Sequence, residues 1–465
     1  MLRDRYAPMN LFDLVPALGL ELEPVLMQLD TLLDDDVLFQ AVKADLARRA
    51  PRTLVTGRSS TPVECLLRLL VVKHLYGWSY AQTEHWVGDS LVLRQFCRIY
   101  AHRVPDATTI LRAANRIQPA TLHALLDHIV ELARQHHVTH GRKLRVDSTV
   151  VETNIHHPVD SGLLVDGVRM VGRLLGRAKT LVGEAATEGS TLFRRRLRSA
   201  RQQLQVIVQT ARRRGEEAAD QMKEPYQRLV RITRQMVRQA VAVEDLLRAQ
   251  GSAAAQQVAD RLGSLRPQVE QVIRQAVRRV LQGAQVPARE KLVSLVEPHT
   301  AIIRKGKPGK PVEFGRVVWL GEVEGGIISE YQVLAGNPDD AAQVRPSLER
   351  HRRLFGKPPD LLTGDRKTQT AANEAYAAQQ GVKHVVLPKA GWKSGARGQQ
   401  ERERWFRRGR NWRAGIEGRI SGLKRRHKLH RCLYHGDAGM ERWIGWGILA
   451  HDLRKIAEAQ AAKAA

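Results

Sequence analysis

Three carboxylates, Asp147, Asp365 and Glu417, stand where their side-chain oxygens could do chemistry. Asp147 lies inside a β-branched stretch, although aspartate is unfavourable within strands. Asp365 closes a short apolar segment, and Glu417 lies among arginines. Mg²⁺ prefers oxygen ligands, and two ions about 3.5–4 Å apart can stabilise both the attacking and the leaving oxygen of a phosphoryl displacement. If the fold gathers the three side chains, they predict metal-dependent phosphoryl transfer.

Each carboxylate also has a purely structural interpretation. Asp365 belongs to the tetrapeptide TGDR, whose residue types are typical of a turn that an aspartate caps. Glu417 can pair with Arg413 or Arg419 along a helix. Residue types alone therefore leave both interpretations open.

The elements that must position these residues change in character along the chain. Residues 1–140 have a mostly helical pattern, which fits either a helix-turn-helix-like DNA-binding unit or a plain helical bundle. Residues 143–151 predict a strand that contains Asp147. Residues 165–290 predict two or three long basic helices. These helices would either track DNA phosphates or form an insertion whose charges face water.

The later part of the chain alternates between strands and helices. Residues 312–334 form two β runs joined by Gly325-Gly326, which predicts a hairpin. Helix, strand, helix, strand and helix follow. This order predicts an α/β fold, a ribonuclease-H-like mixed sheet flanked by helices. Asp365 then lies at the carboxyl end of a strand, where open α/β sheets form their sites.

We accordingly expect four segments. An all-α N-terminal region over 1–140 would serve DNA binding or oligomerisation, and a catalytic domain would span 141–455. A basic helical insertion over 165–298 would interrupt that domain, and a frayed tail would end the chain over 456–465.

Composition narrows the class of partner. The chain has 465 residues and a net charge of +27, which favours a polyanion such as nucleic acid, although a basic surface can serve solubility alone. Its three cysteines are far apart, which argues against disulfides and cysteine-bound zinc. We find neither a secretory leader nor an apolar run of about 18 residues, and we expect a cytoplasmic protein without a membrane span.

Three tryptophans are interleaved with the basic residues near the C-terminus: Trp392, Trp405 and Trp412. Aromatic rings in a basic segment can stack on unpaired bases. Packing into the core is an equally good explanation.

The segment NWRAGIEGRISGLKRRHKLHRCLYHG resembles the C-terminal motif of bacterial insertion-sequence transposases of the Asp-Asp-Glu type. Arg413, Glu417 and Lys424 keep the Arg-x3-Glu-x6-Lys spacing of that family, while the tyrosine place of its motif holds Arg410. Further blocks that look like the family occur in order: RVDSTVVETNIHHPVDSGLL, KPVEFG, AGNPDD and LLTGDR.

The resemblance implies that Asp147, Asp365 and Glu417 are a catalytic triad that binds metal, with two Mg²⁺ ions for which Mn²⁺ can substitute. It implies that DNA is hydrolysed at the ends of the insertion sequence, the mobile DNA element, and that the freed 3′-OH is joined to target DNA. Two other readings stay open: a nuclease that cuts without joining, and an inactive DNA-binding protein derived from a transposase.

The resemblance also implies residues that contact double-stranded DNA. Arg413 and Lys424 would lie near the cleaved phosphate, and we add Arg419 and Arg425 as basic neighbours on the same helix. Because both element ends must be held together, we expect a homodimer on DNA. Such a protein would associate with the bacterial nucleoid.

Overall fold

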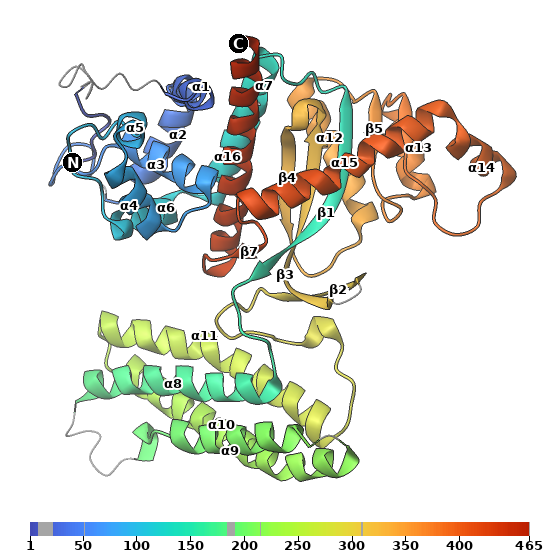
Figure 1. The fold of residues 1–465 in the computed structure, drawn as a ribbon. Helices are drawn as coiled ribbons and strands as arrows, with labels where there is room; N and C mark the ends of the chain where they lie inside the picture. The colour runs from blue at the N-terminus through green and yellow to red at the C-terminus, as the bar shows by residue number, and fades with distance from the viewer. Residues whose placement is uncertain (8–21, 51, 184–190, 214, 308–309, 465) are drawn as a thin grey trace. The chain divides into compact units, whose positions relative to one another are not determined.

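The chain forms two compact units (Figure 1), one made of Met1–Asn154 with Gly315–Ala465 and the other of Ile155–Phe314. The computed structural model describes residues 1–7, 22–50, 52–183, 191–213, 215–307 and 310–464. The second unit contains the expected insertion, 165–298, and extends beyond it at both ends. Within the described residues, no helix has the length and hydropathy that a bilayer crossing demands.

The N-terminal part of the first unit is helical, as expected. Its helices are α1 (Pro24–Leu32), α2 (Asp36–Ala47), α3 (Val63–Tyr76), α4 (Tyr80–Asp89), α5 (Leu91–Phe96), α6 (Ala107–Arg116) and α7 (Pro119–Gln135). Helix α3 is buried along nearly its whole length, and its Arg68 has no exposed surface. The carboxylates of Asp30 and Asp34 lie 2.6 and 2.5 Å from this guanidinium. Asp30 and Asp34 therefore compensate the charge of the buried Arg68 side chain.

The mixed sheet has the order β2-β3-β1-β5-β6, with β4 paired to β3 and β7 paired to β1. Its strands are β1 (Lys143–Thr153), β2 (Ala301–Lys307), β3 (Lys310–Val323), β4 (Ile328–Leu334), β5 (Leu361–Thr363), β6 (His384–Val386) and β7 (Arg431–Cys432). Strand β1 runs antiparallel to β3 and parallel to β5. This arrangement confirms the mixed sheet of a ribonuclease-H-like core that the sequence predicts.

Helices cover both faces of this sheet. The helices that follow β4 are α12 (Val344–Phe355), α13 (Ala371–Gln379), α14 (Gly395–Arg402), α15 (Arg404–Arg426) and α16 (Gly436–Ala464), of which α14 packs on α15. On β3, Trp319 donates a hydrogen bond of 2.7 Å to Ser347 of α12, whereas Glu322 accepts one of 3.1 Å from Arg419 of α15. Because Trp319 and Glu322 are an odd number of positions apart, they point to opposite faces of the strand. Helices α12 and α15 therefore pack on opposite sides.

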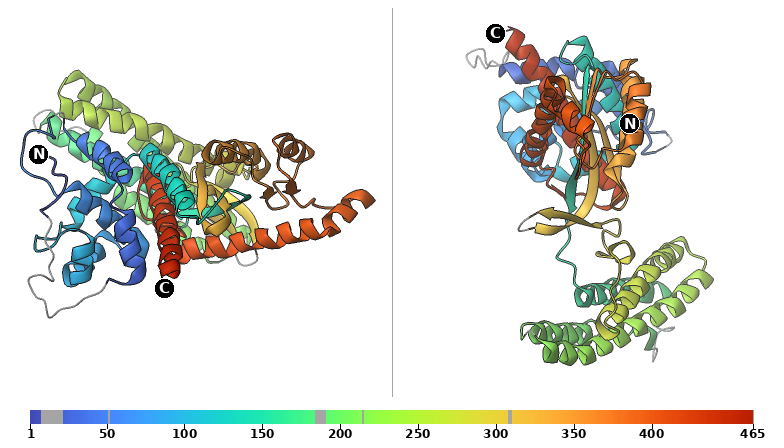
Figure 2. Two further views of the ribbon diagram at one scale, coloured as in Figure 1. Left: turned by 90° about the horizontal axis from the view of Figure 1, so that it is seen from above. Right: turned by 90° about the vertical axis from the view of Figure 1, so that its right-hand side faces the viewer.

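Within the described residues, α16 continues to Ala464, whereas we expected a frayed tail over 456–465. Ile456 and Ala457 are fully buried, and the side chain of Gln460 donates a hydrogen bond of 3.3 Å to the carbonyl of His136 just after α7. Figure 2 shows α16, in red, running beside α7, in teal. Packing of one face thus keeps the helix ordered where composition alone suggests fraying.

In its described residues, the second unit contains a bundle of four α-helices, one more than the upper number expected. They are α8 (Asp160–Val182), α9 (Leu197–Ala211), α10 (Glu216–Ala249) and α11 (Ala253–Ala276), and α11 continues into a π-helical turn over Val277–Leu281. Apolar residues at helical spacing, including Leu164, Leu229 and Val269, form its own hydrophobic core. The arginines between those positions lie mostly towards solvent.

Candidate active site

Asp147 lies within β1, and Asp365 follows shortly after the neighbouring parallel strand β5. Arg145 of β1 is paired with Thr363, the last residue of β5. Asp147 comes two residues after Arg145 and Asp365 two residues after Thr363. Adjacent strands lie about 4.8 Å apart. The topology therefore brings the backbone at two of the three predicted carboxylates to the part of the sheet where β5 ends.

The Asp147 carboxylate is largely shielded, with 13% of its side chain exposed. Its Oδ1 accepts a hydrogen bond of 2.8 Å from the amide of Ser148. Its Oδ2 accepts one of 3.1 Å from Nη2 of Arg413 on α15. Its negative charge is thus compensated from the helix that crosses the sheet.

Asp365 caps the turn after β5. Its Oδ1 accepts hydrogen bonds from the amides of Lys367 at 2.9 Å and Thr368 at 3.2 Å. The structural interpretation of Asp365 is therefore realised. Neither bond uses Oδ2, so the turn also orients the carboxylate without occupying both of its oxygens.

Glu417 lies on α15 with 70% of its side chain exposed. Its Oε1 accepts a hydrogen bond of 3.3 Å from Nη1 of Arg413, one helical turn earlier. Arg413 therefore bridges Asp147 and Glu417, with one terminal nitrogen directed to each. The structure joins these two carboxylates through a guanidinium.

A buried charge network fixes α15 above the sheet. Glu322 of β3 is 1% exposed and accepts hydrogen bonds of 2.9 and 2.6 Å from Arg145 of β1. Arg419 of α15 adds a third bond to the same carboxylate, at 3.1 Å. Arg145 also donates to the carbonyl of Trp412 and lies 4.7 Å above the centre of that indole ring. A Cβ atom at Gly415 would lie 2.5 Å from Nη1 of Arg145, so the close approach depends on glycine there.

The sequence analysis missed this network. Arg145 is a charged residue inside a stretch that otherwise reads as a buried strand, and such a charge needs a buried partner. That signal marks Arg145 as a positioning residue. The sequence does not identify Glu322 as its partner, because the pairing depends on the register between β1 and β3.

The donor set suits a hard divalent cation, although the side chains are not gathered around one point. Among the residues that the structure describes, no group of three or more His, Cys, Asp and Glu side chains is placed to hold a metal ion. The Arg413 guanidinium lies between two carboxylates, so a positive charge is already favoured there. Oxygen donors from Asp147, Asp365 and Glu417 are the ligands that Mg²⁺ prefers.

The four residues expected to contact DNA have different surroundings. Arg413 bridges the carboxylates, and Arg419 is held by Glu322 with 23% of its side chain exposed. Lys424 is half-buried in the last turn of α15, where its carbonyl lies 3.3 Å from Nδ1 of His430. Arg425 is exposed.

Helix α15 carries a wider basic surface than the motif alone. Its buried positions are Phe406, Gly409, Ile416 and Leu423, which fix the side that faces the sheet. The other sides expose arginines near both ends of the helix: Arg404, Arg407, Arg408, Arg410, Arg425 and Arg426. Only Glu417 is acidic within this helix. We call these six exposed arginines the α15 arginine surface.

The three tryptophans divide between packing and exposure. Trp412 lies under Arg145, and the ring of Trp405 stacks on His384 with the ring centres 5.0 Å apart. Trp392 is 80% exposed. Packing therefore accounts for Trp412 and Trp405, while Trp392 is presented to solvent.

Comparison with known protein families covers both ends of the first unit. Residues 20–116 match the model of the family described as Transposase domain (DUF772). Residues 370–457 match that of the family described as Transposase DDE domain, a stretch that contains Arg413, Glu417 and Lys424. No curated protein and no solved structure gives a significant match to the chain.

The two family matches agree with the fold, and the second of them spans α15. Members of this group bind DNA and use divalent metal ions for phosphoryl transfer. Mixed-sheet topology and both family matches identify the chain as a DDE transposase of an insertion sequence.

Proposed function

We propose that Asp147, Asp365 and Glu417 are the metal-binding catalytic triad of this transposase. The observation that carries the proposal is the guanidinium bridge from Asp147 to Glu417. The parallel pairing of β1 with β5, the strand that Asp365 follows, supports it. Two Mg²⁺ ions, or Mn²⁺ in their place, would supply Lewis acidity at the attacking and leaving oxygens.

The proposed reaction has two phosphoryl transfers. In the first, water attacks a phosphodiester at the element end, the P–O3′ bond breaks, and the 3′ oxygen leaves with a proton as a hydroxyl group. In the second, that 3′-OH attacks a phosphodiester of target DNA and displaces another 3′ oxygen. The number of phosphodiester bonds is unchanged in the second step, so no external energy source is needed.

This chain's residues position and neutralise the reacting groups. Arg413 compensates the charges of Asp147 and Glu417. With metal ions on these carboxylates, its guanidinium would be available to a phosphate oxygen. The turn at Asp365 orients that carboxylate through backbone amides. The buried Glu322 network keeps α15 in register with β1.

We infer that DNA lies along the α15 arginine surface, with Lys424 completing it near the triad. Its phosphates would contact the exposed arginines. We assign Arg419 to the scaffold rather than to DNA, because Glu322 holds it. Since two element ends must be joined, we propose a homodimer that works on chromosomal DNA in the bacterial cytoplasm and associates with the nucleoid. Residues 1–140 would contribute DNA binding or assembly.

The test is cleavage of a labelled duplex that carries the element end, taken from the DNA flanking this gene. We expect wild-type protein to cut it only with Mg²⁺ or Mn²⁺, and Asp147→Asn to bind but not cut. Cleavage by Asp147→Asn at the wild-type rate would remove Asp147 from the triad.

An inactive DNA-binding protein is the second candidate, because the three carboxylates are not gathered around one point in the described structure. Binding of the duplex without cleavage under either metal would favour it. Cleavage without joining of the 3′ end would instead indicate a nuclease.

A further inference from the structure

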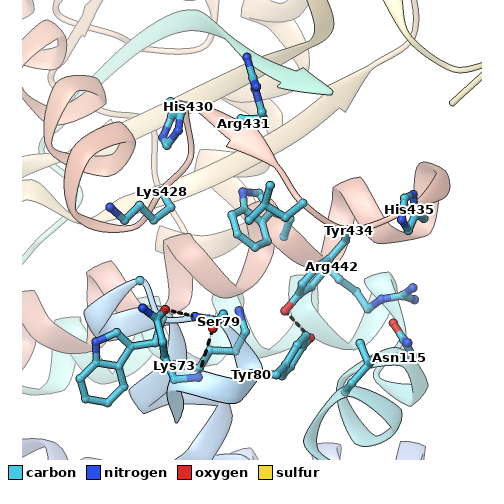
Figure 3. Close-up of a pocket in the computed structure, with 16 residues that line it drawn as sticks. Lys73, Ser79, Tyr80, Asn115, Lys428, His430, Arg431, Tyr434, His435 and Arg442 are labelled. Carbon is cyan, nitrogen blue, oxygen red and sulfur yellow. Dashed lines mark hydrogen bonds between the residues drawn. The ribbon is translucent and has the colours of Figure 1, made fainter. Parts of the chain in front are cut away.

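A cavity of about 770 Å³ lies in the first unit, apart from the triad. It is bordered by the end of α3 and the start of α4 on one side, and by the segment from Lys428 into α16 on the other (Figure 3). Cavities of about 300–1,000 Å³ are the size that proteins use for small ligands. Neither the carboxylates nor the α15 arginine surface borders it.

Aromatic rings build much of its wall. Tyr80 and Tyr434 stack with their ring centres 5.9 Å apart, and their hydroxyls are joined by a hydrogen bond of 2.5 Å (Figure 3). Trp443 meets Tyr434 edge-on with the ring centres 5.0 Å apart, and Trp78 adds a partly exposed indole. Planar surfaces of this kind favour a planar, aromatic ligand.

A lysine is buried among three of these rings. Lys73 is 2% exposed, and its Nζ lies 4.7 Å from the ring centre of Tyr80, 5.2 Å from that of Tyr434 and 5.1 Å from that of Trp443. Burial lowers the pKa of Lys73 to about 7. A bound anion would favour its charged form and so would be bound more tightly in return.

The charged side chains around the cavity also favour binding of an anion. The lining includes the cations Lys428, Arg431 and Arg442, and among its described residues there is no Asp or Glu. Glu152 already pairs with Arg431 at 2.9 Å. The described lining is therefore cationic and supplies no carboxylate of its own.

We infer that this cavity binds a nucleotide, its base against the aromatic wall and its phosphate among the cations. The same chemistry is offered by a free nucleotide and by an unpaired nucleotide of a DNA strand. The second source rests on the proposed function, because a transposase handles DNA ends. Nucleotide binding itself does not depend on the triad.

The experiment measures binding to the full-length protein in two arms. One arm titrates free deoxyadenosine monophosphate by calorimetry. The other titrates a short single strand carrying 2-aminopurine, whose fluorescence falls when the base stacks on a ring. The variants are Trp78→Ala, which removes a partly exposed wall, and Lys428→Glu, which reverses an exposed charge at the cavity. Their matched controls are Trp86→Ala and Lys357→Glu, which replace exposed residues outside the lining.

We expect both cavity variants to weaken binding at least about tenfold, while both controls stay within about twofold of the wild type. Binding in both arms would identify a site open to free nucleotides, and binding of the strand alone would identify a site for an unpaired nucleotide in DNA. Equal weakening by cavity and control variants, or absence of binding in both arms, would overturn the inference. So would equal affinity for inorganic phosphate and the nucleotide, because the base would then contribute nothing.

Asp365→Asn separates this inference from the proposed function. The nucleotide inference predicts unchanged binding in that variant, whereas the proposed function predicts lost cleavage. Thermal unfolding of each variant identifies any that fails to fold, and Trp78→Phe, which keeps an aromatic wall, is expected to restore most of the binding lost in Trp78→Ala.

Discussion

Arg413 donates a hydrogen bond of 3.1 Å to Asp147 and so ties helix α15 to strand β1. The same guanidinium reaches Glu417, which makes it the link between two carboxylates assigned to the triad. A guanidinium in this place stands where a metal ion's positive charge would act. If metal ions bind the proposed triad, arginine and metal would compete for the same oxygens.

This competition predicts that Arg413→Ala raises metal affinity severalfold while weakening DNA binding. Removing the guanidinium leaves Asp147 and Glu417 without their shared cation. A divalent ion would then bind without repulsion from that positive charge. Calorimetric titration with Mn²⁺ measures the effect. Arg353→Ala, which removes an exposed arginine on α12, serves as the control and should not change the affinity. Weaker Mn²⁺ binding in Arg413→Ala would argue against the competition.

Asp365→Asn is expected to abolish strand cleavage and leave DNA affinity nearly intact. An amide keeps the size of the side chain and one oxygen for the turn, but it loses the charge that a metal ligand needs. Gel shift and cleavage assays on one duplex separate the two effects. Asp360→Asn, which alters an exposed neighbour paired with Lys383, should cut normally. Persistent cutting by Asp365→Asn would show that this residue only caps its turn.

Glu322→Ala is expected to destabilise the first unit by about 3–5 kcal/mol, because it leaves Arg145 without its buried partner. Urea unfolding measures the change in free energy. Glu349→Ala removes an exposed carboxylate on α12 and should change stability by no more than about 0.5 kcal/mol. A similarly small loss for Glu322→Ala would mean that α15 is held by its apolar contacts alone.

DNA affinity is expected to fall steeply with salt, because phosphate contacts release counterions. If Arg407 contacts a phosphate, Arg407→Gln should reduce the slope of log affinity against log salt by about 1. Fluorescence anisotropy at several salt concentrations gives the slope. A slope unchanged by Arg407→Gln would place DNA elsewhere than on the α15 arginine surface.

Acid should destabilise the protein before its carboxylates titrate. Burial lowers the pKa of His351 and His427 to about 4 and that of His451 to about 3. These side chains stay neutral in the folded protein, whereas unfolded histidine gains a proton near about pH 6.5. Stability is therefore fully present above that pH and falls as the pH drops below it.

Thermal unfolding at pH 7.5, 6.5 and 5.5 measures this dependence. We expect the melting temperature to drop mainly across the lower interval, and His351→Gln to lessen the drop. His140→Gln, at an exposed position, should not alter it. A melting temperature constant over the three values would contradict the burial of these neutral histidines.

The sheet and the positions of Asp147, Asp365 and Glu417 were predictable from local patterns. A strand interrupted by aspartate, a turn after a short apolar run and a motif of fixed spacing each lie within a few residues. Strand β1, which contains Asp147, then pairs with β5, which Asp365 follows.

Long-range pairings were not predictable. Arg145 and Glu322 meet only because β1 and β3 pair in one register, and Arg419 belongs to their network rather than to the exposed side of α15. The cavity likewise combines Tyr80 with Tyr434, which no local pattern connects. The alanine-rich composition at the end of α16 suggested fraying, because the sequence does not show that this segment packs against α7.

Joining of a pre-cut element end to plasmid DNA tests the central claim most directly. A duplex with a free 3′-OH bypasses hydrolysis, so its transfer depends on the triad alone. The account predicts transfer by wild-type protein with Mg²⁺, and none by Asp147→Asn, Asp365→Asn or Glu417→Gln at equal DNA occupancy. Transfer that survives any of these substitutions would contradict the assignment of that carboxylate. DNA bound by wild-type protein but never joined would contradict strand transfer itself.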